Sequence, residues 1–316
     1  MFDTTFVIEI FVLRYAPNYN KGMLFKDKIY QYVPAKVPDN VTIFRDVDYA
    51  SGARHQLDIY RPKTQHTVGV IVDIYGGGLL RGEKSSYKLQ PSLRFLADHY
   101  AVVSPNYSLN TVHTNHFPNQ IAEIRAVLSF LVAHAETYGL NMTEVVLIGE
   151  SSGAQLAVLT AASISGGVML GEKPAGATFG ELPQISHVIG LYGPYQVDQF
   201  VPQFKKLGIS PKFSETGSKL SFEGIMLNNQ RPADVPELVA QANPATYFSQ
   251  KMPSLYLLAG TADDVVPYLQ SVKLAQEYGD IVGQSAKTTW VSGAHHGPSD
   301  FDTDDIYQQK LAFIRQ

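Results

Sequence analysis

Apolar and polar positions along the chain repeat with two different periods, one typical of strands and one typical of helices. Short apolar runs bounded by turn-forming residues predict eight strands, at residues 41–50, 55–60, 68–75, 100–107, 144–149, 187–193, 254–260 and 286–292. Residues 68–75 (VGVIVDIY) are almost continuously apolar. Such a run is typical of a strand that is buried on both faces of a parallel sheet.

Helices are predicted between and after these strands. Within residues 119–138, apolar side chains recur at a spacing of three and four, as on one face of a helix. Further helices are expected at 152–163, near 266–279 and at 302–315. This alternation predicts an α/β fold with a mostly parallel central sheet and helices on both faces. We expect residues 1–316 to form a single domain of this kind.

Two segments do not follow the alternation. Residues 194–252 are rich in proline and phenylalanine, and so long a connection usually carries helices or a function of its own. We predict that this insertion forms a cap over the carboxyl ends of the strands. The alternative is a surface excursion that only covers the edge of the sheet. Residues 1–40 form an N-terminal extension ahead of the first predicted strand.

Composition and charge narrow the function. The formal net charge is −4, and no run of Lys and Arg suggests a nucleic-acid groove or an anionic membrane surface. A highly anionic substrate would need local positive charge that the sequence does not reveal. The chain has no cysteine, which excludes disulfides, thiolate metal sites and a cysteine nucleophile.

The first residues, MFDTTFVIEIFVLRYAP, are apolar but lack a basic start and contain Asp3 and Glu9. The apolar run is too short to span a membrane. We therefore expect a short strand or helix packed on the main domain, with no membrane span, and a cytoplasmic rather than a secreted protein. A homodimer is an assembly that the sequence leaves open.

The sequence Gly149-Glu150-Ser151-Ser152-Gly153 lies directly between a predicted strand and a predicted helix of small residues. A serine on a sharp strand-to-helix turn is exposed above the sheet, and glycines on either side give the strained turn room. The helix N-terminus would then lie beneath a developing oxyanion. This context favours Ser151 as a nucleophile over an ordinary serine in a tight turn.

Three glycines, Gly76-Gly77-Gly78, follow the strand at 68–75. Their backbone N–H groups are open to a ligand, so those of Gly77 and Gly78, joined by that of Ser152, could form an oxyanion hole. A flexible loop and a phosphate-binding turn are the alternatives. The phosphate alternative is weak, because no Gly-Lys-Ser/Thr sequence follows.

Acid and base candidates follow the last two predicted strands. Asp263 and Asp264 both stand at a strand's carboxyl end, where one can orient a histidine and the other can cap the next helix. His296 lies in the Gly-flanked loop GAHHG, where a general base is expected. His113 and His116 are its main rivals, but they precede Ser151 in the chain. The order Ser151, Asp263, His296 is the one expected for a nucleophile-elbow hydrolase.

The chain from about residue 41 to 315 resembles the hormone-sensitive-lipase-like or feruloyl-esterase-like group of α/β-hydrolases. The resemblance rests on LDIYRP at 57–62, IYGGGLLRGEK at 74–84, NYSL at 106–109, FP at 117–118, GESSGAQLA at 149–157, GTADDVVP at 260–267 and GAHHG at 293–297. It implies an α/β-hydrolase fold and a serine carboxylesterase. It also implies an acid at Asp263 rather than Asp264, a base at His296 rather than His295, and an oxyanion hole from Gly77, Gly78 and Ser152.

The chain departs from that group's pattern at three positions. Tyr75 stands where the group usually has His. Ser108 replaces the Arg of a usual Tyr-Arg-Leu sequence, and Glu123 replaces the Asp that usually follows Phe-Pro. The last two sites often form a supporting ion pair in the group. None of the three positions belongs to the predicted triad.

These observations predict a serine hydrolase that cleaves carboxylic esters through an acyl-enzyme. Its partner would be a small-molecule ester, and no metal or organic cofactor is implied. Esters of short acyl chains are the first expectation, and aryl or hydroxycinnamoyl esters are the second. An aryl-formamide hydrolase resembling kynurenine formamidase is the alternative enzyme. A non-catalytic binding protein on the same fold is the alternative outside enzymes.

Overall fold

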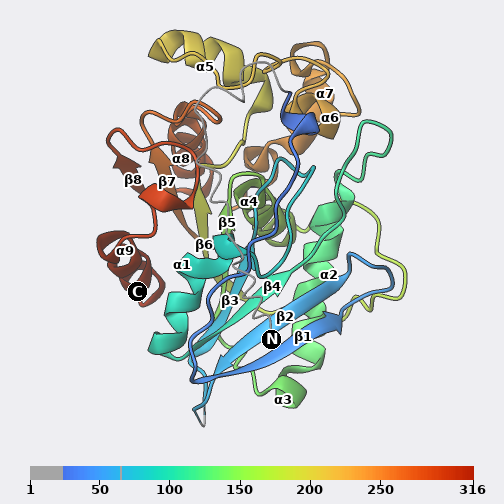
Figure 1. Ribbon diagram of the computed structural model, residues 1–316, viewed down its shortest axis with the longest axis vertical. Helices are drawn as coiled ribbons and strands as arrows, with labels where there is room; N and C mark the ends of the chain where they lie inside the picture. The colour runs from blue at the N-terminus through green and yellow to red at the C-terminus, as the bar shows by residue number, and fades with distance from the viewer. Residues whose placement is uncertain (1–23, 65) are drawn as a thin grey trace, which may run out of the picture.

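The structure, a computed structural model, describes residues 24–64 and 66–316 (Figure 1). Its centre is one eight-stranded sheet in the order β1-β2-β4-β3-β5-β6-β7-β8. The strands are β1 (Val41–Asp48), β2 (Gln56–Pro62), β3 (Gly69–Ile74), β4 (Tyr100–Pro105), β5 (Val145–Glu150), β6 (Ile185–Leu191), β7 (Ser254–Gly260) and β8 (Lys287–Val291). The strand or helix predicted within residues 1–17 lies outside the described residues.

All eight predicted strands are confirmed, with ends that shift by a few residues. The pairs β1/β2 and β2/β4 are antiparallel, and the other neighbours are parallel. The mostly parallel sheet is therefore confirmed. Because parallel strands point the same way, the loops that follow β3, β5, β7 and β8 meet at one edge of the sheet.

Helices cover both faces of the sheet, as predicted (Figure 1). The apolar side chains of each strand alternate between two cores, so that Val70 and Val72 face one and Ile71 faces the other. The first core is closed by α2 (Asn119–Ala133), α4 (Ser152–Ser165) and α8 (Leu269–Val282). The second core is closed by α1 (Gln90–Leu93) and α9 (Asp304–Ile314).

Some helix boundaries differ from the prediction. The expected helix at 119–138 is interrupted at His134, where φ is −117°, and α3 (Ala135–Tyr138) follows as a separate turn. Residues 87–98 contain short helices that were not predicted: η2 (Tyr87–Leu89), α1 and η3 (Arg94–Asp98). Each is only one or two turns long, which is too short for helical spacing of apolar residues to be recognised.

The segment 194–252 contains η4 (Val197–Gln199), α5 (Phe200–Leu207), α6 (Phe222–Met226), η5 (Pro232–Asp234), α7 (Pro236–Ala242) and η6 (Pro244–Tyr247). Three of its prolines occupy the first turns of η5, α7 and η6, where the missing N–H group costs no hydrogen bond. Figure 1 shows α5, α6 and α7 gathered at one end of the molecule. That this segment acts as a cap stays a prediction.

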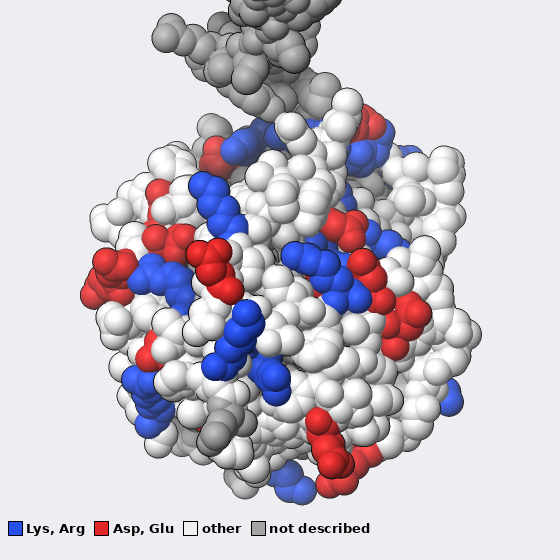
Figure 2. Space-filling model, turned by 60° about the horizontal axis from the view of Figure 1, so that its bottom comes forward, with Lys and Arg blue, Asp and Glu red and all other residues white. Residues whose placement is uncertain are grey.

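Charged side chains on the face drawn in Figure 2 are of both signs and lie interspersed over a largely uncharged surface. No helix within the described part of the chain combines the length and the apolar character needed to cross a membrane.

Candidate active site

Ser151 lies on the sharp turn between β5 and α4, as predicted. Its backbone has φ 52° and ψ −127°, a strained conformation for a residue with a side chain. A Cβ atom on Gly149 would lie 2.2 Å from the Gly153 carbonyl oxygen, and one on Gly153 would lie 2.0 Å from that of Ile74. Only glycine fits either position, so the close packing of β3, β5 and α4 explains both residues of the motif.

The structure brings Ser151, His296 and Asp263 into one hydrogen-bonded chain. The Nε2 atom of His296 lies 2.9 Å from the Ser151 Oγ atom, and its Nδ1 atom lies 2.7 Å from Oδ2 of Asp263. Asp263 is 1% exposed, whereas Ser151 is half-buried and borders a cavity. The other candidate histidine in the loop, His295, has a largely exposed side chain and lies near Asp300 instead.

Asp263 also makes two hydrogen bonds within its own turn. While Oδ2 faces His296, Oδ1 accepts the N–H groups of Val265 and Val266 at 2.8 and 2.9 Å. The expectation that the other aspartate, Asp264, caps the next helix is wrong, because α8 begins at Leu269 and the Asp264 side chain accepts none of its N–H groups. Asp264 instead accepts the Lys212 N–H through its backbone oxygen.

The glycine loop after β3 lies beside the serine. Gly77 and Gly78 have φ values of 143° and 64°, which residues with side chains rarely adopt. A Cβ atom on Gly77 would lie 2.0 Å from the Arg81 carbonyl oxygen. The N–H groups of Gly77, Gly78 and Ser152 have no hydrogen-bond acceptor among the described residues. These are the three groups that were predicted to form an oxyanion hole.

A buried ion pair supports the turn beneath Ser151. One oxygen of Glu150 lies 2.7 Å from Nζ of Lys88 and accepts the Gly76 N–H at 3.1 Å. Its other oxygen accepts the hydroxyl of Tyr192, whose ring packs edge-on against the ring of His296. Burial alone would raise the pKa of Glu150, but Lys88 and these hydrogen bonds hold it below its ordinary value.

Tyr75 takes the place that the related hydrolases give to histidine. Its ring stacks on Tyr107 with 4.4 Å between centroids, and its hydroxyl accepts a hydrogen bond from Arg54 at 2.5 Å. The Tyr107 hydroxyl in turn donates to the Tyr75 carbonyl oxygen at 2.7 Å. The start of the glycine loop is thus held by aromatic stacking and by a guanidinium group.

The pair of sites that carries an Arg–Asp ion pair in the related hydrolases is occupied differently. Glu123 accepts the N–H and the hydroxyl of Ser108 at 2.7 and 2.6 Å. Nε2 of His55, from the turn before β2, lies 3.2 Å from the Glu123 carboxylate and forms an ion pair with it when the imidazole is protonated. The hydrogen bond with Glu123 is the main reason that the pKa of His55 is raised above its ordinary value.

A cavity of about 340 Å³ opens in front of Ser151 and His296. Phe213 and Phe222, from the phenylalanine-rich segment 194–252, line its wall. Other side chains of the wall were not recognised in the sequence: the aromatic Phe25, Tyr30 and Tyr87, and the cationic Lys28, Arg81, Lys88 and Lys212. Phe25 contacts Phe213 and Phe222, with ring centroids 5.1 and 5.3 Å apart. The N-terminal extension and the segment 194–252 therefore meet at this wall.

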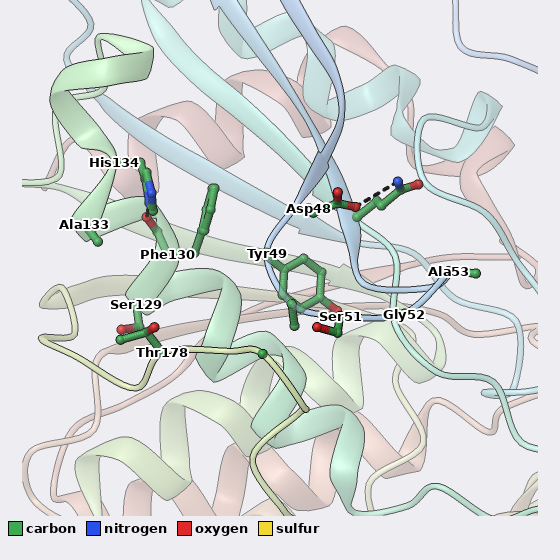
Figure 3. A pocket seen from close by; sticks show the side chains of 13 residues that line it. Asp48, Tyr49, Ser51, Gly52, Ala53, Ser129, Phe130, Ala133, His134 and Thr178 are labelled. Carbon is green, nitrogen blue, oxygen red and sulfur yellow. Dashed lines mark hydrogen bonds between the residues drawn. The ribbon is translucent and has the colours of Figure 1, made fainter.

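A second and larger cavity, of about 710 Å³, lies between α2 and the turn that joins β1 to β2 (Figure 3). No serine hydroxyl that lines it is hydrogen-bonded to its histidine, His134. Ser129 accepts the Gly180 N–H at 2.7 Å, and Nδ1 of His134 lies 2.9 Å from the Phe130 carbonyl oxygen. This cavity thus holds no activated nucleophile.

Among residues 24–64 and 66–316, no three His, Asp or Glu side chains gather as a metal site would require. The first cavity presents a hydroxyl paired with an imidazole, beside open N–H groups.

Known proteins resemble most of this chain. A probable isoprenylcysteine alpha-carbonyl methylesterase from Oryza sativa subsp. japonica is 25% identical over 240 residues, which is 74% of this chain and 53% of that protein. The chain spans about half the length of the first curated relatives that it matches.

Solved structures share the fold. A truncated carbohydrate esterase from gut microbiota superposes with a TM-score of 0.70 and 23% identity, over 90% of this chain and 98% of that one. Esterase B from Lactobacillus rhamnosis superposes with a TM-score of 0.65 and 20% identity, over 89% of this chain and 86% of that one. The α/β-hydrolase fold is therefore confirmed.

The BD-FAE family model matches residues 57–278, well over half of the chain. The matched region contains Ser151 and Asp263, and His296 follows it. The chain belongs to the BD-FAE family, which agrees with the resemblance seen in its motifs.

Proposed function

We propose that this protein is a serine carboxylesterase. The observation that carries the proposal is the chain of hydrogen bonds from Ser151 through His296 to Asp263, beside three open backbone N–H groups. A hydroxyl is a weak nucleophile at neutral pH, and an adjacent imidazole that takes its proton activates it. Esterases among the related proteins and structures support the same reaction class.

In the first half of the reaction, the Ser151 oxygen attacks the ester carbonyl while His296 accepts the hydroxyl proton. Asp263 keeps the imidazole in the tautomer that can accept this proton and stabilises the imidazolium ion. The N–H groups of Gly77, Gly78 and Ser152 stabilise the negative oxygen of the tetrahedral intermediate. The intermediate collapses, and the alcohol leaves with the proton from His296.

In the second half, water takes the place of the alcohol. His296 accepts a proton from this water as it attacks the acyl-enzyme, and a second tetrahedral intermediate forms in the same N–H pocket. Collapse of the intermediate returns the proton to Ser151 and releases the carboxylic acid. The enzyme is then ready for another ester.

Hydrolysis of an activated ester, 4-nitrophenyl acetate, tests this proposal. We expect Ser151→Ala to lower kcat by several powers of ten, about 10⁴-fold or more. A phosphonate ester should label the wild type at Ser151 and leave Ser151→Ala unlabelled. Ser285→Ala, which alters an exposed serine outside the cavity, should retain wild-type turnover and labelling. Near-normal turnover by Ser151→Ala would refute the assignment, and an unreactive wild type would point to a binding protein.

Short acyl chains are the proposed substrates, because the aromatic wall limits the volume of the cavity to about 340 Å³. A series of 4-nitrophenyl esters of increasing chain length should show the highest kcat/KM for the shortest chains. A preference for long chains would refute this part of the proposal. Adding N-formylkynurenine to the series compares ester with aryl-formamide hydrolysis on the same enzyme.

A further inference from the structure

Three cationic side chains of the cavity wall come from parts of the chain that are far apart. Lys28 precedes β1, Arg81 belongs to the loop after β3, and Lys212 lies between α5 and α6. Because they are far apart along the chain, they do not form a basic run, and the sequence alone does not reveal the cluster. The fold brings all three to the cavity that holds Ser151 and His296.

Two of these cations, Arg81 and Lys28, contact carbonyl oxygens or aromatic rings and no carboxylate within residues 24–64 and 66–316. The guanidinium group of Arg81 donates to the carbonyl oxygens of Phe25 and Lys28 at 2.8 and 2.9 Å, and lies 3.7 Å from the centre of the Phe25 ring. Nζ of Lys28 lies 4.4 Å from the centre of the Phe213 ring. No ion pair among the described residues includes Lys28, Arg81 or Lys212.

The fourth cation of the wall, Lys88, has a carboxylate partner, which the three cations of the cluster lack in the described part of the chain. Lys88 is more deeply buried, but it lies 2.7 Å from Glu150 and its charge is compensated. Two acidic residues, Glu215 and Asp264, lie near Lys28. The carboxylate of Glu215 accepts the Phe25 N–H at 2.5 Å, and Asp264 makes no side-chain hydrogen bond with the described residues.

The neighbouring cations affect the pKa of Lys28 more strongly than the two acidic residues do. Burial, followed by repulsion from Lys212 and Arg81, lowers the pKa of Lys28, and the opposing attractions of Glu215 and Asp264 are smaller. Burial also lowers the pKa of Arg81, to about 10. An anion in the cavity would relieve the repulsion among these cations and replace their lost hydration, so the cluster favours a negative ligand.

We propose that the preferred substrate is an ester that carries an anionic group, such as a carboxylate, which Lys28, Arg81 and Lys212 bind while Ser151 attacks the ester carbonyl. This inference rests on the proposed esterase function and specifies its substrate. The charge can belong to the acyl part or to the alcohol part of the ester. Each case has its own pair of probes.

Two matched pairs of esters separate charge from shape. The alcohol part is tested with 4-acetoxybenzoate against the neutral 4-acetoxybenzamide. The acyl part is tested with mono-4-nitrophenyl adipate against neutral 4-nitrophenyl hexanoate. We expect at least one anionic ester to have a kcat/KM about tenfold or more above its neutral partner, since a single charge-assisted contact has this order of magnitude. The preference should decrease as salt is added, because the cavity is open to solvent.

The substitutions Lys28→Met and Lys212→Met remove one charge each while they keep most of the apolar stem. Each should reduce the ratio of the two kcat/KM values by about three- to tenfold. A ratio of rates does not depend on the fraction of folded enzyme, so partial misfolding cannot produce the effect. Arg81→Lys keeps the charge and should preserve most of the preference. Lys251→Met, which alters an exposed lysine outside the cavity, should leave both rates unchanged.

The outcomes distinguish this inference from the proposed function. If neutral and anionic esters react equally well in both pairs, the substrate inference fails and the esterase assignment stands. The inference also fails if an anionic preference survives in the Lys28→Met/Lys212→Met double variant as strongly as in Lys251→Met. If the wild type hydrolyses none of the four esters, the proposed function fails and this inference fails with it.

Discussion

Replacement of Asp263 by Asn distinguishes the role of this carboxylate in catalysis from its role in stabilising the turn. Three hydrogen bonds end on the side chain, one from His296 at 2.7 Å and two from the N–H groups of Val265 and Val266 at 2.8 and 2.9 Å. Asn has the same shape, and its oxygen can keep the two backbone bonds. The opposite orientation would set its NH₂ group against two N–H donors, which costs about 1–3 kcal/mol for each group left unpaired.

The favoured orientation therefore turns the NH₂ group of the introduced Asn side chain toward Nδ1 of His296. That atom must then accept a hydrogen bond, so the ring proton moves to Nε2, which faces Ser151. An imidazole in this tautomer cannot take the serine proton. We expect kcat to fall about 10⁴-fold, equivalent to roughly 5 kcal/mol in the activation barrier. The free energy of unfolding should fall by only about 1 kcal/mol.

The assay measures kcat and KM for 4-nitrophenyl acetate, together with urea unfolding of the same samples. Asp264→Asn is the matched control, since its carboxylate is adjacent in the chain and makes no side-chain hydrogen bond with the described residues. It should keep wild-type turnover of this neutral ester. An inactive Asp264→Asn beside an active Asp263→Asn would overturn the reasoning, as would an Asp263→Asn variant that is inactive only because it is unfolded.

Three further changes test the surroundings of the site by urea unfolding. Gly153→Ala places a methyl group 2.0 Å from the backbone of β3 and should cost about 3 kcal/mol or more. Lys88→Met leaves Glu150 buried without its cation and should cost about 3 kcal/mol, part of which a second change, Glu150→Gln, restores. The hydrogen bond with Glu123 raises the pKa of His55. The stabilisation that this bond gives the fold is therefore present below pH 6.5 and is lost as the pH rises through the raised pKa. His55→Gln should cost about 1 kcal/mol more at pH 5.5 than at pH 9. A loss by His55→Gln that is equal at both pH values, or no loss by the other variants, would contradict these assignments.

The sequence predicted the parts of the site that depend on local rules. Gly149 and Gly153 indicated a turn in which only glycine fits, and Cβ atoms on them would indeed overlap the neighbouring backbone. The histidine and the aspartate could be placed because each follows a strand, and parallel strands end at a common edge.

The other parts of the site depend on contacts between irregular segments, in which apolar residues do not recur at a regular spacing that would predict structure. Lys28 and Lys212 stand in irregular segments that long-range hydrogen bonds hold, from Arg81 to the Lys28 carbonyl oxygen and from the Lys212 N–H group to the Asp264 carbonyl oxygen. The exchange of Arg for Ser108 was visible, but the compensating partner, His55, comes from a turn before β2. Likewise, the double use of Asp263 follows from the backbone direction of one turn, which residue types do not specify.

The nucleophile follows a central strand of the sheet, whereas the base follows an edge strand. Ser151 follows β5, which has strands on both sides, whereas His296 follows β8, the partly exposed last strand, which pairs with β7 alone. Outer strands open locally at a lower free energy than central ones. Warming should therefore release the imidazole while most of the fold is still intact, so that the thermal limit of turnover lies below that of the protein as a whole.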